Sequence, residues 1–307
     1  SSDVCSSDLE TARSVGVTGA LGNLGWKLLL HLAAHSTAPR LIALDYREAD
    51  QTHRDALRDA ANGRTVDIEF VACDLTDWDD ARWRDAFDRV EGVVHFAAQN
   101  PFPEASWSDV DASAAMNFNT AHAAADSETV ERYVFATSNH VMGRYKDRDM
   151  SAGALRPELE PGVGTLWHTG QRDMDSTVYA TAKWTGERHC QALGRRANGS
   201  TTFACVRIGW CQPGANRPDT LSAAGTPTQA HGGQQESPTD RWYKRMWLSN
   251  RDFCQLFQRA VEADGSTWPG GCVVVHGMSN NRDMPWNIDA TRQYLAYEPQ
   301  DDVYRGV

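Results

Sequence analysis

The 307-residue sequence lacks three features, each of which would indicate a different class of protein. Its seven cysteines form no CxxC pair and no metal-ligand spacing, which argues against a structural metal and favours a reducing compartment. Its longest apolar run, near 28–32, is far too short to cross a bilayer. Acidic residues outnumber basic ones, and the formal net charge of -11 argues against a general binder of nucleic acid or anionic membranes. We therefore expect a cytoplasmic protein with no metal, nucleic-acid or membrane partner.

The first dozen residues, 1–12, lack any periodic pattern, and we interpret them as a disordered tail or a remnant foreign to the fold. From 13 to 307 the chain alternates short β-rich runs with longer amphipathic runs, as in a parallel sheet with crossover helices. This pattern predicts one extended α/β domain, a Rossmann-type doubly wound parallel sheet with a small C-terminal substrate lobe. The expected strands are 14–19, 40–45, 66–74, 92–98, 132–138, 201–209 and 271–277, and the expected helices are 23–35, 51–61, 77–90, 107–126, 177–195, 249–263 and 287–297.

Two polar segments, at about 144–176 and 211–248, break this alternation. Both show no sustained period, and both exceed the usual length of about 12–15 residues for an unstructured connection. Each leaves the carboxyl end of a strand, where open α/β sheets bind their ligands. We therefore interpret them as substrate-side insertions; a surface excursion without a ligand is the alternative.

The stretch VTGALGNLG, residues 17–25, places three glycines between a strand and a helix. Gly19 would permit a tight turn, Gly22 a close approach of backbone to a pyrophosphate, and Gly25 close packing of the helix on the strand. We therefore expect a dinucleotide here, contacted by Gly19, Gly22, Asn23 and Leu24. A purely structural turn would use the same glycines, so the assignment depends on the residues that close the neighbouring strands.

A carboxylate, Asp45, closes the second predicted strand about 20 residues after the glycine turn. At that place it would accept hydrogen bonds from the adenosine ribose and repel a 2′-phosphate, which favours NAD over NADP. Arg47 comes two residues later and could hold such a phosphate, so NADP stays as the less favoured cofactor. The ends of the third and fourth strands supply the remaining expected cofactor contacts, Asp74, Leu75, Ala97 and Ala98.

Tyr179 and Lys183 stand four apart in a predicted helix, so their side chains share a face. A tyrosine with a pKa near ~10 is a poor base at neutral pH. A neighbouring ammonium, together with an oxidised nicotinamide, would stabilise the phenolate and lower that pKa. Ser138, at the end of the fifth strand, could then orient a substrate hydroxyl for proton loss to Tyr179. The three residues predict metal-free interconversion of alcohol and carbonyl.

The motifs TGALGNLG, CDLTD, HFAA, TSNHVMG and YATAK, together with Asp45 and Asn117, resemble the extended short-chain dehydrogenase/reductase superfamily from residue 14 onward. The resemblance implies that Asn117 supports the active site through its helix. It also implies that Lys183 contacts the nicotinamide ribose as part of the cofactor site. Dimers of this superfamily bury helices equivalent to 107–126 and 177–195, so we expect a homodimer or higher homo-oligomer.

The strings TSNHVMG, VRIGWCQPG and WLSNRDF are similar to uronate dehydrogenases, which oxidise C1 of a uronic acid to a lactone with NAD. By this resemblance Asn139 and His140 bind sugar hydroxyls and Arg207 holds the substrate carboxylate. The alternatives are a salt bridge at a strand end for Arg207 and a hydrogen-bonded loop histidine for His140. Asn100 and Trp210 complete the expected substrate contacts.

The predicted function is therefore NAD-dependent oxidation of the C1 hydroxyl of a sugar or sugar acid to a lactone. A nucleotide-sugar epimerase or dehydratase with tightly bound NAD is the first alternative, although the chain lacks the Asn that such enzymes usually carry after the sixth strand. A redox-sensing binder without catalysis is the second. The sequence also departs from uronate dehydrogenases, because 41 positions separate Ser138 from Tyr179 where they have a short loop.

Overall fold

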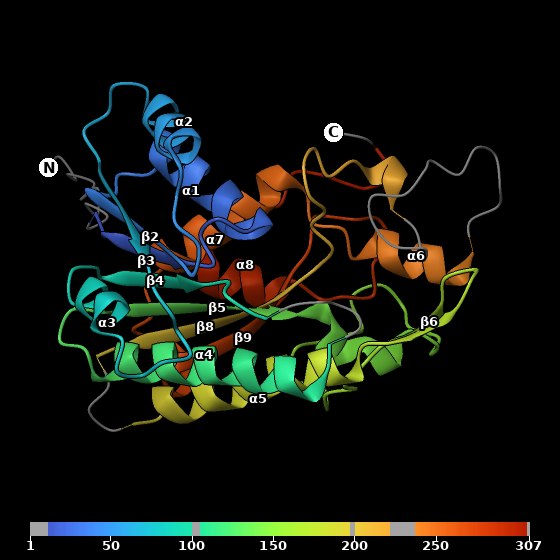
Figure 1. Cartoon of the computed structure of the whole chain (residues 1–307). Helices are drawn as coiled ribbons and strands as arrows, with labels where there is room; N and C mark the ends of the chain where they lie inside the picture. The colour runs from blue at the N-terminus through green and yellow to red at the C-terminus, as the bar shows by residue number, and fades with distance from the viewer. Residues whose placement is uncertain (1–11, 100–104, 197–199, 222–236, 306–307) are drawn as a thin grey trace, which may run out of the picture.

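The computed structural model describes residues 12–99, 105–196, 200–221 and 237–305. Its main element is a seven-stranded sheet in which every neighbouring pair is parallel. The strands are β1 (Val15–Thr18), β2 (Arg40–Asp45), β3 (Asp67–Ala72), β4 (Gly92–His95), β5 (Arg132–Ser138), β8 (Thr202–Ile208) and β9 (Cys272–Gly277). Their order is β3-β2-β1-β4-β5-β8-β9, which confirms the predicted doubly wound α/β fold (Figure 1).

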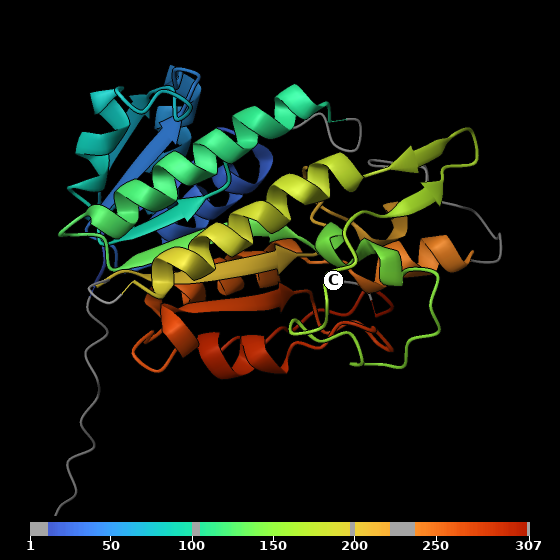
Figure 2. The ribbon, with the colours of Figure 1, turned by 90° about the horizontal axis from the view of Figure 1, so that it is seen from below.

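Helices cover both faces of the sheet, so most of its strands are buried (Figure 1). One face packs against α1 (Asn23–His35), α2 (Gln51–Ala61), α7 (Asn250–Glu262) and α8 (Asp289–Leu295). The other packs against α3 (Ala81–Phe87), α4 (Trp107–Asp126) and α5 (Thr177–Gly194). Figure 2 shows α4 and α5 side by side across that second face.

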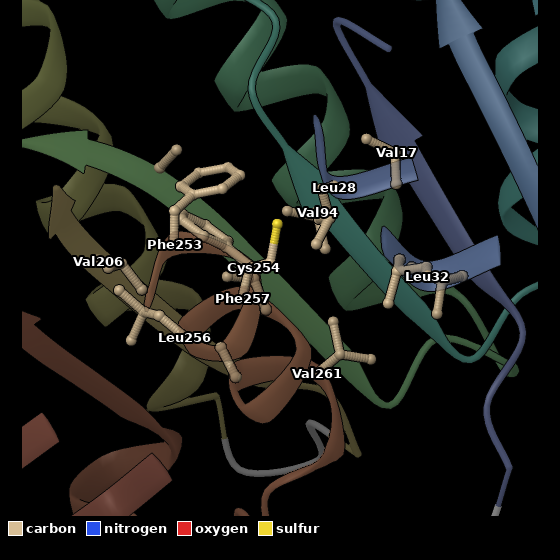
Figure 3. Packing of buried hydrophobic residues seen from close by; sticks show 14 of the residues in the cluster. Val17, Leu28, Leu32, Val94, Val206, Phe253, Cys254, Leu256, Phe257 and Val261 are labelled. Atoms are coloured by element: carbon tan, nitrogen blue, oxygen red, sulfur yellow. The ribbon is translucent and has the colours of Figure 1, made fainter. Parts of the chain in front are cut away.

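The helix α7 illustrates how the sequence pattern builds this core. Phe253, Phe257, Ala260 and Val261 recur at helical spacing and are all almost fully buried. In Figure 3 the side chains of α7 lie against Val94 of β4. Burial of one large apolar side chain contributes about 1.5–3 kcal/mol, so this single stripe holds α7 firmly on the sheet.

The two segments predicted as substrate-side insertions contain regular structure that their polar composition did not reveal. The first begins at the end of the 3-10 helix η1 (Asn139–Tyr145) and contains an antiparallel pair, β6 (Leu166–His168) and β7 (Asp173–Asp175). The second holds η2 (Pro218–Thr220) and α6 (Pro238–Arg245). A further 3-10 helix, η3 (Pro269–Gly271), leads into β9.

A hydrophobic cluster separate from the main core, here called the third cluster, joins these segments to the C-terminal part of the chain. It is rich in methionine and tryptophan and consists of Val141, Met142, Tyr145, Leu155, Trp167, Met174, Trp242, Tyr243, Met246, Met278, Met284, Trp286 and Ile288. In the parts of the chain that the structure describes, no helix is both long and apolar enough to cross a membrane. The predicted tail, 1–12, lies outside the described residues except for its last position.

Candidate active site

The turn between β1 and α1 has the geometry of an anion-binding site. Gly19 adopts a φ of 63°, and a Cβ there would lie 2.8 Å from the backbone nitrogen of Ala97. A Cβ at Gly25 would lie 2.3 Å from the carbonyl oxygen of Gly19, so the helix packs too closely on the turn for any side chain. Gly22 caps α1 without a side-chain hydrogen bond, which leaves the first amides of the helix available to a phosphate.

A cavity of about 700 Å³ opens beside this turn, across the carboxyl ends of β3, β2, β1 and β4. Seven residues predicted from the sequence as cofactor contacts line it: Gly19, Gly22, Asp45, Asp74, Leu75, Ala97 and Ala98. Asn23 and Leu24, also predicted as contacts, are the first residues of α1. The Asn23 side chain donates to the carbonyl oxygen of Cys211, and the Leu24 side chain packs against the main core. Ser138 ends β5, the next strand beyond β4 in the sheet.

Asp45 lies at the edge of this cavity with both carboxylate oxygens engaged. The amide of Leu21 donates to Oδ2 over 2.9 Å, which fixes the carboxylate next to the glycine turn. Arg47 donates to Oδ1 through its backbone amide and its Nε, each over 3.1 Å. Asp74 accepts from the amide of Thr76 over 2.9 Å, whereas the N-cap of α3 is Asp80, so Asp74 does not cap that helix.

Ser138, Tyr179 and Lys183 come together where β5 ends against α5. A hydrogen bond joins the side chains of Ser138 and Tyr179. Lys183 lies one turn further along α5, with Nζ 6.0 Å from the centre of the Tyr179 ring, and donates to the carbonyl oxygen of Ala136 over 2.9 Å. The predicted spacing of four residues therefore places the ammonium near the phenol. Lys183 and Ser138 are buried and Tyr179 is partly buried, so charges interact more strongly here than in water.

Burial shifts the pKa values of Tyr179 and Lys183 in the directions that favour the neutral form of each side chain. Burial raises the pKa of Tyr179 to about 12, and the hydrogen bond with Ser138 opposes this rise. Burial lowers the pKa of Lys183 to about 8. The protein alone thus keeps Tyr179 protonated at neutral pH, and further positive charge at the site is needed to favour the phenolate.

His140 comes two residues after Ser138 and is held as a neutral ring. Its Nδ1 lies 2.7 Å from Thr165 Oγ1 and 3.1 Å from Ser176 Oγ, and burial lowers its pKa to about 3. The ring meets that of Tyr179 edge-on, with 6.0 Å between centres. Asn139 donates to the carbonyl oxygen of Ile208, while its Oδ1 is buried and has no hydrogen-bond partner among the described residues.

The structure places Arg207 in a buried ion pair rather than in an open pocket. Its Nε and Nη2 donate to the two carboxylate oxygens of Glu187 over 2.9 and 2.7 Å, and both side chains are at least 96% buried. Nη1 donates to the carbonyl oxygen of Pro157. For Arg207 the structure therefore shows the alternative, a salt bridge, because Glu187 already neutralises the guanidinium that was predicted to hold a substrate carboxylate.

The aromatic residues near the site form a row away from Tyr179. The ring of Trp167 stacks over His140 at 6.1 Å, and Tyr243 meets Trp167 at 5.6 Å and Trp210 at 4.5 Å. Trp210, a predicted substrate contact, is partly buried in this row. Another predicted substrate contact, Asn100, lies outside the described residues.

Comparison with known proteins identifies the family to which this chain belongs. Residues 15–274 match the model of the NAD dependent epimerase/dehydratase family. The chain belongs to this family. This match confirms the family predicted from the sequence. It also confirms NAD as the predicted cofactor.

Three curated relatives of this NAD-dependent family cover most of the chain. An NAD-dependent glucose-6-phosphate dehydrogenase from Haloferax volcanii is 30% identical over 93% of this chain and 92% of its own length. An L-arabinose 1-dehydrogenase (NAD(P)(+)) from the same organism is 26% identical over 94% and 96%. A uronate dehydrogenase from Agrobacterium fabrum is 24% identical over 94% and 84%.

Solved structures support the family fold. The enzyme WbmG from Bordetella bronchiseptica, in complex with NAD and UDP, superposes with a TM-score of 0.59 at 15% identity, over 95% of this chain and 90% of that one. A UDP-glucuronic acid 4-epimerase from Bacillus cereus, in complex with UDP-glucuronic acid and NAD, gives 0.61 at 13% identity over 95% and 96%. At such low identity these likenesses concern the fold alone.

The residues of this family member fit a dinucleotide. A glycine turn that a Cβ would block, an uncapped helix start and a carboxylate at the end of β2 are the groups that bind pyrophosphate and ribose. Asn117 of α4 is buried and donates to the Tyr133 hydroxyl over 3.4 Å, and within the described chain its Oδ1 has no partner. Sequence reasoning missed Glu187, although its position four residues after Lys183, on the same helix face, marked it as a buried carboxylate that needs a cation.

Proposed function

We propose that this chain is an NAD-dependent dehydrogenase that oxidises the C1 hydroxyl of a sugar to a lactone. The observation that carries the proposal is the hydrogen bond between Ser138 and Tyr179, with Lys183 one turn away at the carboxyl end of β5. The activities for which the relatives are named agree, since three kinds of sugar dehydrogenase align over most of the chain.

Each of the three residues has a distinct task in this reaction. Ser138 donates to the substrate hydroxyl oxygen and aims its proton at Tyr179. Tyr179 takes that proton as general base, and the positive charge of Lys183 favours the phenolate that accepts it. NAD supplies the hydride acceptor. We assign to His140, whose neutral ring is edge-on to that of Tyr179, a hydrogen bond to a sugar hydroxyl without added charge.

The pairing of Arg207 with Glu187 bears on the charge of the sugar. Without a free guanidinium at that position, we place neutral aldoses ahead of uronic acids as substrates. We also propose that the segments 144–176 and 211–248 roof the sugar site, because Trp167 and Tyr243 from these segments continue the aromatic row that starts at His140.

Net production of NADH separates this function from its alternatives. We expect absorbance at the wavelength of reduced cofactor to grow when purified protein receives NAD and a panel of neutral aldoses, aldose phosphates and uronic acids. A family member acting as an epimerase or dehydratase would regenerate its cofactor and give no net growth while converting a nucleotide sugar. Absence of turnover with both substrate classes would favour a redox-sensing binder.

The rate of sugar oxidation should rise with pH and then level off. Loss of the Tyr179 proton is required and its pKa is raised, so kcat/KM should increase by up to about tenfold per pH unit in the acidic and neutral range. Above about pH 8 the ammonium of Lys183 is lost, which removes the charge that favours the phenolate and flattens the curve. Initial rates from pH 6 to 10 measure this pH dependence.

The variant Lys183→Arg keeps the positive charge to higher pH, so its kcat/KM should level off at a higher pH than that of the wild type. A rate that falls between pH 6 and 8 would contradict the role of Tyr179 as general base.

We also propose that the chain forms a homodimer or higher homo-oligomer through α4 and α5. These helices lie side by side on one face of the sheet (Figure 2). Trp107 and Phe118 of α4 are 61% and 36% exposed, which is unusual for large apolar side chains on a solvated surface.

A further inference from the structure

Three hydrogen bonds join α5 to consecutive residues of β5. They run from Lys183 Nζ to the carbonyl oxygen of Ala136 over 2.9 Å, from Thr137 Oγ1 to Glu187 Oε1 over 2.8 Å, and between the side chains of Ser138 and Tyr179. Their three residues on α5 stand four positions apart, so they lie on one face of the helix. We call this set the α5–β5 bonds. Together they fix how far the helix is shifted along the strand.

The bond between Thr137 and Glu187 is the member of this set whose two residues have no task in the proposed reaction. Thr137 is 0% exposed and Glu187 is 2% exposed. A hydrogen bond to an ionised carboxylate is about twice as strong as one between neutral groups, and the low dielectric of a buried site strengthens it further. Because Thr137 directly precedes Ser138 in the strand, a bond that holds its side chain also limits the movement of Ser138.

Glu187 is itself anchored to a second strand, β8. Arg207 Nε and Nη2 donate to its two carboxylate oxygens over 2.9 and 2.7 Å. Arg207 is also the direct neighbour of Thr137 in the parallel pairing of β8 with β5. Its remaining nitrogen, Nη1, donates to the carbonyl oxygen of Pro157 over 3.1 Å. A shift of α5 along the sheet would therefore break the bonds of Glu187 to two strands at once.

We propose that Thr137 is a positioning residue for sugar oxidation, which acts through Glu187 to keep Ser138 and Tyr179 in contact. This inference rests on the proposed function, because it assigns Thr137 to the same reaction. A misplacement of reacting groups by about 1 Å can lower a rate by about 10²-fold. One buried hydrogen bond that fixes the helix against the strand can therefore change kcat although neither of its residues touches the substrate.

The variant Thr137→Val tests this role, because it replaces the hydroxyl with a methyl group of similar size and leaves Glu187 paired with Arg207. We expect kcat for the best sugar of the panel to fall by about tenfold, while KM for the sugar and for NAD stays within about twofold, since alignment is lost and binding contacts remain. Thr137→Ala should lower kcat to the same extent. Thr137→Ser keeps the hydroxyl and should restore kcat to within about twofold of the wild type. Initial rates of NADH production measure these effects, and thermal unfolding followed by circular dichroism gives the Tm of each variant.

Thr201→Val is the matched control. Thr201 is also buried, at 2% exposure, and its Oγ1 lies 2.9 and 2.7 Å from the carbonyl oxygens of Ala124 and Val130. It directly precedes β8, at the opposite end of the sheet from Ser138. We expect this variant to lower Tm and to leave kcat unchanged.

Three results would overturn the role of Thr137 in an active enzyme. They are a wild-type kcat in Thr137→Val and Thr137→Ala, a Thr137→Ser variant that stays as slow as Thr137→Val, and a Thr201→Val variant that loses as much kcat as Thr137→Val. A wild-type chain that oxidises no sugar would instead overturn the proposed function, and the role of Thr137 with it. The two failures are therefore told apart by the activity of the wild type.

Discussion

Replacing Tyr179 with phenylalanine should lower kcat for sugar oxidation by about 10²–10⁴-fold, the range that a positioned general base supplies. The ring would stay, and with it the edge-on contact to His140, while the hydroxyl that hydrogen-bonds Ser138 would be lost. Because the cavity that fits the dinucleotide lies across the other strands, affinity for NAD should change little. Initial rates of NADH production, with fluorescence titration of NAD, measure the two effects separately.

A second tyrosine offers the control for this experiment. The hydroxyl of Tyr145 donates to the carbonyl oxygen of Glu160, within the segment after η1 and away from Lys183. Tyr145→Phe should leave kcat within about twofold and lower stability by about 1 kcal/mol, the usual contribution of one hydrogen bond. If Tyr179→Phe behaved like Tyr145→Phe, the general-base role would be wrong and a binding protein without catalysis would become the better explanation.

Replacing Arg207 with methionine should destabilise the fold by about 3–5 kcal/mol, because a buried carboxylate would lose its partner. Glu187 would retain only the hydrogen bond from Thr137 Oγ1, over 2.8 Å, in a site closed to water. Urea unfolding followed by circular dichroism measures the loss. An arginine whose main partner was a substrate anion would instead raise KM and leave stability nearly unchanged.

The double variant Arg207→Met with Glu187→Leu measures the interaction energy between the two residues. Removing both charges leaves no unpaired ion, so the double variant should be more stable than Arg207→Met alone. Additive losses from the two single changes would show that the residues do not interact, contrary to the 2.7 Å contact in the structure. Testing KM of the double variant on neutral and acidic sugars would also show whether either charge reaches the substrate.

The long elements and the glycine turn were predictable because each depends on local patterns. The predicted bounds of α1, β2, α2, α4 and β5 equal those of the structure, and α2 and α4 each start at a side-chain N-cap. Ser106, for example, forms a capping box with Asp109 at the start of α4. The cavity residues at the strand ends were predictable from the parallel order of the sheet, which places those ends together.

The rest depended on contacts between distant parts of the chain. The strands β6 and β7 have three residues each, too few for a period to be visible, and the short α6 owes its place to Tyr243 packing against Trp167. Arg207 was assigned by resemblance, but its partner Glu187 comes from another element, 20 positions earlier. Helical spacing could mark Glu187 as a buried carboxylate, but it could not show that Arg207 would be its partner.

The third cluster has a consequence for how the protein can diversify. Its residues pack against one another on the side of the molecule that we propose for the sugar, apart from the two clusters that flank the sheet. Methionine side chains are unbranched and adapt to new shapes, so we expect substitutions among them to reshape the proposed sugar site and to leave the dinucleotide half unstrained. We therefore expect the chain to tolerate substitutions widely around the proposed sugar site and only narrowly around the cofactor cavity.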